Sequence, residues 1–464
     1  MTLESHPASG ILYQCWGIVS PAGEAARGES CVEQGRGHTV KGRGESDGGS
    51  QGTLSELRGS DRVRASAFLL LVALVLGVVV GFLTFAVLRL GDLAQSTLWE
   101  GLRGTLPEGV RAAYPLVVCT VGGILVEAWT RRCGYTLDTL SVVVAHCREN
   151  GGYSVRSWGR SLVLFLLPIA FGGAVGPEAG ISGFAAAGFT ASMAALRRSG
   201  GAVADDPSKP VRSGVPALSP KWVGREARLM HKRHKAVVWA VAGIGFVLGA
   251  VALARLAGPA GALPRFPAID YLHSSVLAAL LALVLGWGLS VAGTVAGRAA
   301  KSAADRMSRA GVPRAVICGV VLGAVAVLLP NVLFSGESAT GDLVGGWQGV
   351  GVAVLFATAL AKVCLTKLCV ACDWVGGEFF PLIFCGVSMG YVAAALLGVD
   401  PLLPVAVAAG AVVSASTRKP LLTVCVLALC FPPQSLPAVA VAAFVAAKLP
   451  LGVSSGKTSE DQGE

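Results

Sequence analysis

The sequence predicts an all-α protein that crosses a membrane several times. Apolar residues make up 53% of the 464 residues and charged residues only 14%, with a mean hydropathy of +0.65. A soluble domain carries about 25% charged residues, so this chain lacks the polar surface that a water-exposed fold needs. Long charge-free runs, and apolar segments broken by glycine and proline, favour the same class. The composition excludes a soluble enzyme, a disordered protein and a secreted disulfide scaffold.

Several apolar runs are typical of plain membrane-spanning helices. About 20 apolar residues cross the hydrocarbon core of a bilayer, and the run 66–88 carries no charge before Arg89. Similar runs cover 236–254, 274–297 and 315–335, with further stretches near 113–126, 343–361 and 436–447. We therefore expect a membrane domain over residues 64–452, with the lipid bilayer as its partner.

The two ends of the chain differ from this domain. Residues 1–63 are rich in glycine, serine, glutamate and arginine and contain no apolar run that could pack, which predicts a disordered tail. This stretch also lacks the apolar core of a signal peptide. Residues 453–464 form an equally polar but short tail.

The distribution of basic residues indicates how the chain is oriented in the membrane and argues against nucleic acid as a partner. The segment 197–235 carries ten Lys or Arg against three acids, and 298–314 carries five against one. Both segments are expected to be cytoplasmic loops. The net charge of +10 does not indicate nucleic-acid binding, because basic and aromatic residues do not interleave along the chain.

Two apolar segments, 162–196 and 374–399, each contain a single charged residue, Glu178 and Glu378 respectively. A carboxylate inside a membrane segment costs roughly 2.5–3.5 kcal/mol, so each is a candidate functional residue. Each also follows a Gly-Gly pair and lies near a proline, a pattern that starts a helix. The sequence therefore predicts two helices that begin within the membrane.

The start of such a helix is suited to holding an anion. Its first N–H groups have no intrahelical partner, and leaving them bare in an apolar setting is costly. Hydrogen bonds from these groups to a charged partner contribute roughly 1.5–3 kcal/mol each, more than the helix dipole does. Neither segment contains Lys or Arg, so an anion held there is free to leave. This chemistry favours anion permeation over catalysis.

Glu178 is the predicted gate of this pathway. A tethered carboxylate competes with a permeant anion for the same donors, and the path opens when it swings out or is protonated. The alternative is a glutamate that only caps the helix start. For Glu378 the open alternatives are a residue of the anion site, whose amide donates while its side chain points away or stays protonated, and a cap of the helix start.

Three short motifs resemble signatures of the CLC family of chloride channels and transporters. Residues 176–180 (GPEAG) resemble G-[RK]-E-G-P, residues 377–381 (GEFFP) match G-x-F-x-P, and residues 416–421 (STRKPL) resemble S-x-R-x-P-L. Their order and rough spacing agree with the family over about residues 64–450. The chain as a whole is therefore similar to a CLC protein.

This resemblance implies a CLC-type fold with tilted, discontinuous helices in two inverted halves, near 64–297 and 315–452. It implies a homodimer that carries chloride or another small monovalent anion across a cell membrane. The residue usage suggests that this is a bacterial plasma membrane. Glu178 is then the gating glutamate, with no catalytic residue, cofactor or metal. The anion-binding backbone N–H groups belong to Gly176, Ala179, Gly180, Gly377, Glu378, Phe379 and Phe380, with Pro177 part of the region but without an N–H.

The chain also departs from the family pattern. The signature G-S-G-I-P is absent, the nearest segment being 133–137, and the last tyrosine is Tyr391. The run 236–254, where proton-coupled members often carry an inner glutamate, contains no acid. This favours a passive channel, with an anion/proton antiporter using Glu127 or Glu337 as the alternative. Chloride, fluoride and nitrate cannot be distinguished.

Three rival interpretations have weaker support. Residues 180–183 match the G-x-S-G of intramembrane serine proteases, with Ser182 as nucleophile, but His231 and His234 lie in a basic loop. The spacing of Cys364, Cys369 and Cys372, with Cys385 beyond, matches an iron–sulfur motif, although core thiols explain it better. Asp373 and Trp374 are expected at a membrane interface.

Overall fold

The computed structural model describes residues 59–224, 232–258 and 264–451. In these ranges the chain is helical, and its one β-type pairing is an isolated bridge between Gly176 and Gly377. Six of the described helices are long and apolar enough to cross a membrane. The predicted all-α membrane fold is confirmed. The predictions for residues 1–58, for 453–464 and for His231 lie outside the described residues.

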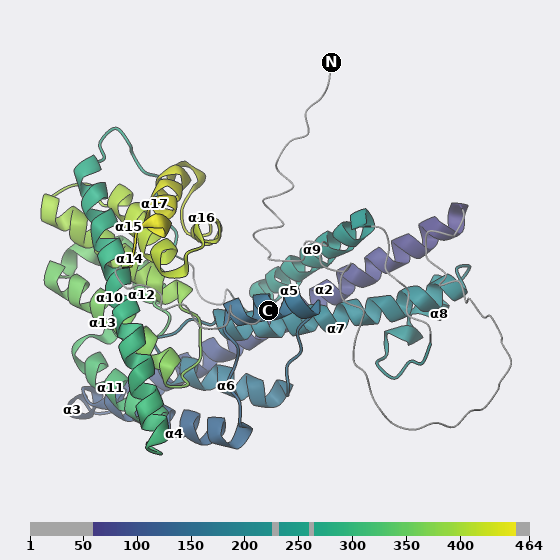
Figure 1. Ribbon diagram of the computed structural model, residues 1–464, viewed down its shortest axis with the longest axis horizontal. Helices are drawn as coiled ribbons and strands as arrows, with labels where there is room; N and C mark the ends of the chain where they lie inside the picture. The colour runs from purple at the N-terminus through teal and green to yellow at the C-terminus, as the bar shows by residue number, and fades with distance from the viewer. Residues whose placement is uncertain (1–58, 225–231, 259–263, 452–464) are drawn as a thin grey trace, which may run out of the picture.

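Three long helices run side by side and extend away from the rest of the molecule (Figure 1). They are α2 (Gly59–Ser96), α7 (Glu178–Asp205) and α9 (Lys232–Ala257). The first two glycines of α2 that face α9 are Gly77 and Gly81, where a Cβ would meet backbone carbonyls of α9. Small residues let membrane helices approach this closely.

A second group of helices packs around α14 and α15 (Figure 1). Its members are α10 (Val276–Arg309), α13 (Val352–Ala371), α14 (Phe379–Leu397), α15 (Leu402–Thr417), α16 (Pro420–Leu427) and α17 (Leu436–Lys448). The helix α14 is apolar on all sides and is buried over most of its length. A helix of this kind belongs in the interior of a membrane domain.

A third unit joins these groups. It pairs α4 (Tyr114–Cys133) with α11 (Arg314–Leu328), and Gly123 and Gly319 allow close backbone contact between them. The shorter helices are α3 (Glu108–Arg111), α5 (Leu140–Asn150), α6 (Trp158–Ala170), α8 (Pro210–Gly214) and α12 (Glu337–Gly346). Short turns η1 (Thr97–Leu102), η2 (Pro216–Leu218), η3 (Pro330–Val332), η4 (Trp347–Gly349) and η5 (Pro433–Ser435) complete the set.

Exposed apolar residues lie in stripes on the helices. On α2 the side chains of Leu71, Val75, Val79 and Leu83 repeat every four residues and are about half exposed. A spacing of four places them on one face of the helix. An apolar stripe on the outside of a helix suits contact with lipid rather than water.

Several predicted boundaries differ from the structure. The run 315–335 does not form one helix, because Pro330 lacks the N–H that a continuing helix requires and α11 ends at Leu328. The run 343–361 is split at Gly349 and Gly351, between α12 and α13. Helix α2 begins at Gly59, before the expected start of the domain.

The two basic segments also contain more helix than expected. Helix α7 continues to Asp205 and α10 continues to Arg309, so both helices extend into the stretches interpreted as loops. Lys and Arg have good helix propensity, and a helix that leaves the hydrocarbon can continue in water.

Candidate functional site

Two loops from distant parts of the sequence meet inside the membrane domain. One joins α6 to α7, and the other joins α13 to α14. Gly176 and Gly377 exchange two backbone hydrogen bonds across the meeting point, with N–O distances of 2.7 and 2.6 Å. This pairing brings the starts of α7 and α14 together. We call the space around Gly176, Gly377 and the Phe380 N–H the junction.

The carboxylate of Glu178 occupies the junction. Its Oε1 accepts a hydrogen bond of 2.9 Å from the backbone N–H of Phe380, in the first turn of α14. A Cβ built on Gly176 or on Gly377 would overlap the carboxylate, so both positions must lack a side chain. The Oε2 atom is buried and has no hydrogen-bond partner among the described residues. A carboxyl group therefore lies between two helix starts.

The predicted donors divide into two sets. The N–H groups of Gly176 and Gly377 donate to each other's carbonyl and are not directed at the carboxylate. The first helical hydrogen bond of α7 runs from Ile181 to Pro177, which leaves the Ala179 and Gly180 amides outside the helical ladder. For these amides, as for the Phe380 N–H, the helix itself supplies no acceptor.

The backbone hydrogen bonds at the start of α14 follow the same pattern. The first helical bond runs from Leu382 to Glu378, so the amide of Phe379 also lies in the free first turn. The side chain of Glu378 does not enter the junction. It forms an ion pair with Lys367 of α13, and both side chains are partly exposed. The carboxylate is thus paired with a cation, in contrast to that of Glu178.

Two contacts hold the loops in this arrangement. Thr366 of α13 donates a 2.8 Å hydrogen bond to the Ala174 carbonyl in the first loop. Asp373, whose φ of 66° is left-handed, accepts a 2.7 Å hydrogen bond from Arg314. A turn fixed by an ion pair and a threonine keeps the two helix starts in register.

Trp374 is not an interface anchor, contrary to the prediction. It is fully buried at 0% exposure, and its indole N–H donates to the Ala315 carbonyl at 3.0 Å. Gly122 and Gly173 leave room for the ring, since a Cβ at either would crowd it. A tryptophan whose N–H finds a partner can be buried in full.

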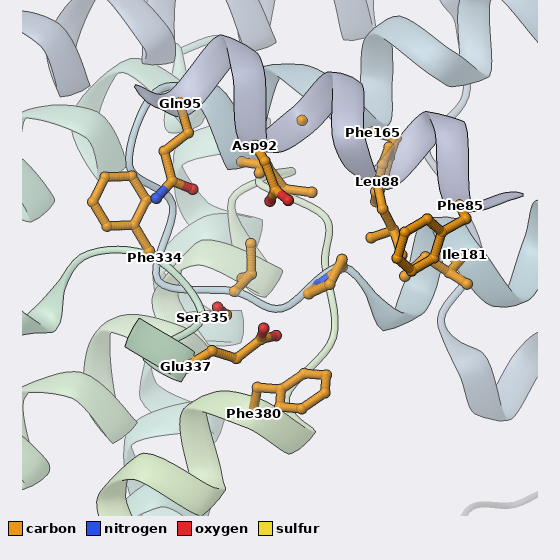
Figure 2. Close-up of a pocket in the computed structure, with 14 residues that line it drawn as sticks. Phe85, Leu88, Asp92, Gln95, Phe165, Ile181, Phe334, Ser335, Glu337 and Phe380 are labelled. Atoms are coloured by element: carbon orange, nitrogen blue, oxygen red, sulfur yellow. The ribbon is translucent and has the colours of Figure 1, made fainter. Parts of the chain in front are cut away.

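A cavity of about 240 Å³ lies beside the junction. Its wall includes Pro177 and Phe380, which border Glu178 in sequence or by hydrogen bond. Figure 2 shows Asp92 on α2 and Glu337 at the start of α12 directed toward the cavity from opposite sides. The space next to the junction is therefore lined by two further carboxyl groups and by aromatic rings.

The remaining family-like segments have local structural roles. Arg418, in the third motif, has a left-handed φ of 57° and donates to the carbonyl of Leu449 at 2.8 Å. It joins the end of α15 to the end of α17. In the segment 133–137, the hydroxyl of Tyr135 lies 3.2 Å from that of Ser161 at the start of α6.

The rival sites gain no support in the described part of the chain. The hydroxyl of Ser182 donates to the Ala179 carbonyl at 2.9 Å, an ordinary contact within a helix. The sulfur of Cys369 lies 3.8 Å from that of Cys318, while that of Cys385 contacts the Ala359 carbonyl. No set of three metal-ligating residues is grouped there.

Glu127, one of the carboxylates considered for proton transfer, is used elsewhere. One oxygen accepts the Ala315 N–H at 2.9 Å and the other pairs with Arg131 at 2.7 Å. It caps the start of α11. Of the two residues considered, Glu337 is the one that lines the cavity.

Known proteins share this fold. Residues 229–450 match the family model described as voltage gated chloride channel. The fold is similar to that of a slow cyanobacterial Cl⁻/H⁺ antiporter, at 16% identity and a TM-score of 0.52, over 85% of this chain and 97% of that chain. It is similar to a eukaryotic CLC transporter at 17% identity and a TM-score of 0.52, over 83% and 71% of the two chains.

A CLC-type fluoride/proton antiporter aligns at 17% identity and a TM-score of 0.47, over 84% of this chain and 96% of that chain. No curated protein matches the chain significantly.

The fold and the junction define a multi-pass membrane protein in which broken helices meet at one point. The family model for voltage gated chloride channels matches residues 229–450, just under half of the chain, and the fold is similar to that of solved CLC transporters.

Sequence reasoning missed the groups that support the junction. Thr366 and Arg314 lie far along the chain from the loops they hold, and nothing in their immediate sequence indicates the contact. Lys367 carried a usable signal. It is a cation in an otherwise apolar stretch, next to a segment with one unpaired acid, and such charges in membranes tend to pair.

Proposed function

We propose that this protein moves small monovalent anions, chloride foremost, across a lipid bilayer, and that Glu178 is the gate. The observation that carries the proposal is the position of the Glu178 carboxylate, which lies at the junction and accepts the Phe380 N–H. A carboxylate oxygen and a halide ion accept the same kind of hydrogen bond. The carboxylate therefore stands where a permeant anion would bind.

The neutral donors suit passage rather than storage. Backbone N–H groups bind an anion without a fixed positive charge, so an ion can be replaced quickly by the next one. The candidate donors are the amides in the first turns of the two helices, Ala179, Gly180, Phe379 and Phe380, together with Glu378 at the cap of α14. The Gly176 and Gly377 amides contribute by joining the loops.

We propose passive conduction as the transport mode. The helix α9 contains no acid along its length, so it offers no inner carboxylate to carry a proton from the cytoplasmic side. The second candidate is exchange of anions for protons. The presence of Glu337 and Asp92 in the cavity beside Glu178 favours it, because these groups could deliver protons to the gate.

A flux assay in liposomes tests both modes. The purified protein is reconstituted with internal chloride, and chloride efflux and external pH are recorded together for wild type and Glu178→Gln. Efflux without proton movement supports a channel, whereas uphill proton movement supports exchange. If wild type passes no small monovalent anion and Glu178→Gln changes nothing, the proposed function fails.

We also propose that two copies form a homodimer with one pathway in each subunit, in a bacterial plasma membrane. The resemblance to CLC proteins supports the dimer, and the exposed apolar stripes of the described helices support the membrane location. Light scattering of the detergent-solubilised protein tests this, and a mass of one chain per particle would contradict it.

A further inference from the structure

Lys362 on α13 is a charged side chain in the interior of the membrane domain. Its exposure is 0%, and the residues that adjoin it in sequence, Ala361 and Val363, are apolar. No acidic partner is seen for it in the parts of the chain that the structure describes. A buried ammonium group is costly unless polar groups surround it, so its surroundings must replace water.

Four consecutive carbonyl groups provide this replacement. The Nζ atom lies 3.0, 3.2, 2.9 and 3.0 Å from the carbonyl oxygens of Asn331, Val332, Leu333 and Phe334, respectively. The Phe384 ring of α14 adds a cation–π contact at 4.9 Å. We call these four oxygens the carbonyl ring.

The local backbone explains why four successive carbonyls can converge. The turn η3 curls the chain, and Phe334 and Gly336 then adopt left-handed φ angles of 60° and 90°. A non-glycine residue in this region needs support from its surroundings. A Cβ at Gly336 would crowd the Lys362 side chain, so the turn is closed directly over it.

The turn is also part of the candidate pathway. Phe334, Ser335 and Glu337 line the cavity beside the junction. On the other side of the ammonium group, Phe384 lies one helical turn after Phe380, whose N–H meets Glu178. Lys362 thus connects the cavity wall to the helix that carries the gate's donor.

We infer that Lys362 is a positioning residue for the anion pathway, a tethered ammonium ion that fills the carbonyl ring and fixes the turn 331–336. Without it, four carbonyl oxygens would point at one another in a buried space with no donor. The turn would then open toward solvent, and Glu337 and Phe334 would lose their places in the cavity wall. The effect on anion flux rests on the proposed function, whereas the effect on the turn does not.

An ion that matches the lysine head group provides the test. In Lys362→Ala, methylammonium can supply the N–H donors and the charge, whereas tetramethylammonium supplies only the charge. We expect Lys362→Ala to lose about tenfold in anion flux, the loss expected for a group held by several charge-assisted hydrogen bonds. Methylammonium should restore much of it and tetramethylammonium none. Lys301→Ala, which removes an exposed lysine of α10, is the control and should match wild type.

A second readout measures the turn without any transport. Ser335→Cys places a thiol in the cavity wall, and its reaction with a membrane-impermeant maleimide is timed in the single variant and in the Ser335→Cys/Lys362→Ala double variant. We expect faster labelling in the double variant and a return to the slow rate with methylammonium.

Slow labelling of the double variant together with unchanged flux in Lys362→Ala overturns the inference. So does a failure of methylammonium to restore labelling, flux or the yield of folded protein. If labelling responds as expected but wild type carries no anion, the positioning role stands and the proposed function fails.

Discussion

Two glutamates occupy nearly equivalent places in the molecule and behave in opposite ways. Each lies at the start of a broken membrane helix after a glycine-rich loop, Glu178 as the first residue of α7 and Glu378 as the N-cap residue of α14. Glu178 lies at the junction and accepts a backbone N–H. Glu378 forms an ion pair with Lys367 and does not enter the junction.

We expect these two residues to serve different purposes at one site. A carboxylate with no cation beside it competes for the anion's donors and can act as a gate. A carboxylate paired with lysine has its charge largely neutralised, so it adds little repulsion to an approaching anion. The difference depends on Lys367, which has no counterpart beside Glu178 in the described loops.

Removal of the Glu178 charge should have the largest effect. Glu178→Gln no longer competes as an anion for the Phe380 N–H, which gives up a charge-assisted hydrogen bond of about 1.5–3 kcal/mol. We expect anion flux at neutral pH to rise about 10–100-fold. Flux in the wild type should increase as the solution becomes more acidic, because a protonated gate is neutral, and the variant should lose this response.

Liposome flux between about pH 5 and 8, the range over which a buried carboxyl group can change its charge, measures both effects. A variant that keeps the wild-type pH profile would show that the gate is another group.

A side chain at Gly377 should close the junction. In Gly377→Ala the new Cβ would stand where the Glu178 carboxylate now lies. We expect this change to lower the flux of the Glu178→Gln protein about tenfold, since an anion would lose at least one hydrogen bond. Gly345→Ala, on an open face of α12 with no neighbour near its Cβ, should leave flux unchanged. Equal flux in the two glycine variants would contradict the assigned position of the anion.

Removal of Lys367, the lysine that pairs with Glu378, should have a smaller effect on anion binding. Lys367→Met leaves Glu378 without its cation, and repulsion should weaken chloride binding by roughly threefold, as expected for a partly exposed pair. Glu378→Gln alone should change affinity little, and the double variant should return close to wild type. A double-mutant cycle on chloride affinity measures the coupling. Additive effects would mean that the pair does not influence the junction.

The smallest effect is expected from a residue that only supports the loops. Thr366→Val retains the shape of the side chain but removes the hydrogen bond to Ala174. We expect a loss of about 1 kcal/mol in stability and little change in anion selectivity. Thermal unfolding in detergent measures the first and liposome flux the second. A large change in selectivity would assign Thr366 to the pathway itself.

The sequence was sufficient to predict the two helix starts. A Gly-Gly pair, a nearby proline and one lone acid mark both, and the helices begin at Glu178 and Phe379. Both helix starts are determined by residues close to them in sequence, so a short stretch of sequence is enough to predict them. The spans that failed, such as 343–361, did so because average hydropathy hides Gly349 and Gly351 within an apolar run.

The way the two starts meet could not be predicted. The bridge between Gly176 and Gly377 joins residues from different halves of the chain, and only the packed fold brings them together. The same holds for Trp374, whose indole N–H is satisfied by Ala315 far away in sequence. Lys362 was missed because the predicted span ended at residue 361, one position before it.

Chloride binding measured by isothermal titration calorimetry tests most directly whether the Glu178 carboxylate and the anion share one place. Wild type and Glu178→Ala are titrated in the same detergent, with Glu178→Ala/Gly377→Ala as the control for the position of the site. We predict that Glu178→Ala binds chloride at least about tenfold more tightly than wild type, and that the second substitution removes this gain. Equal affinities for wild type and Glu178→Ala would contradict this prediction, since the carboxylate would then occupy a place that no anion uses.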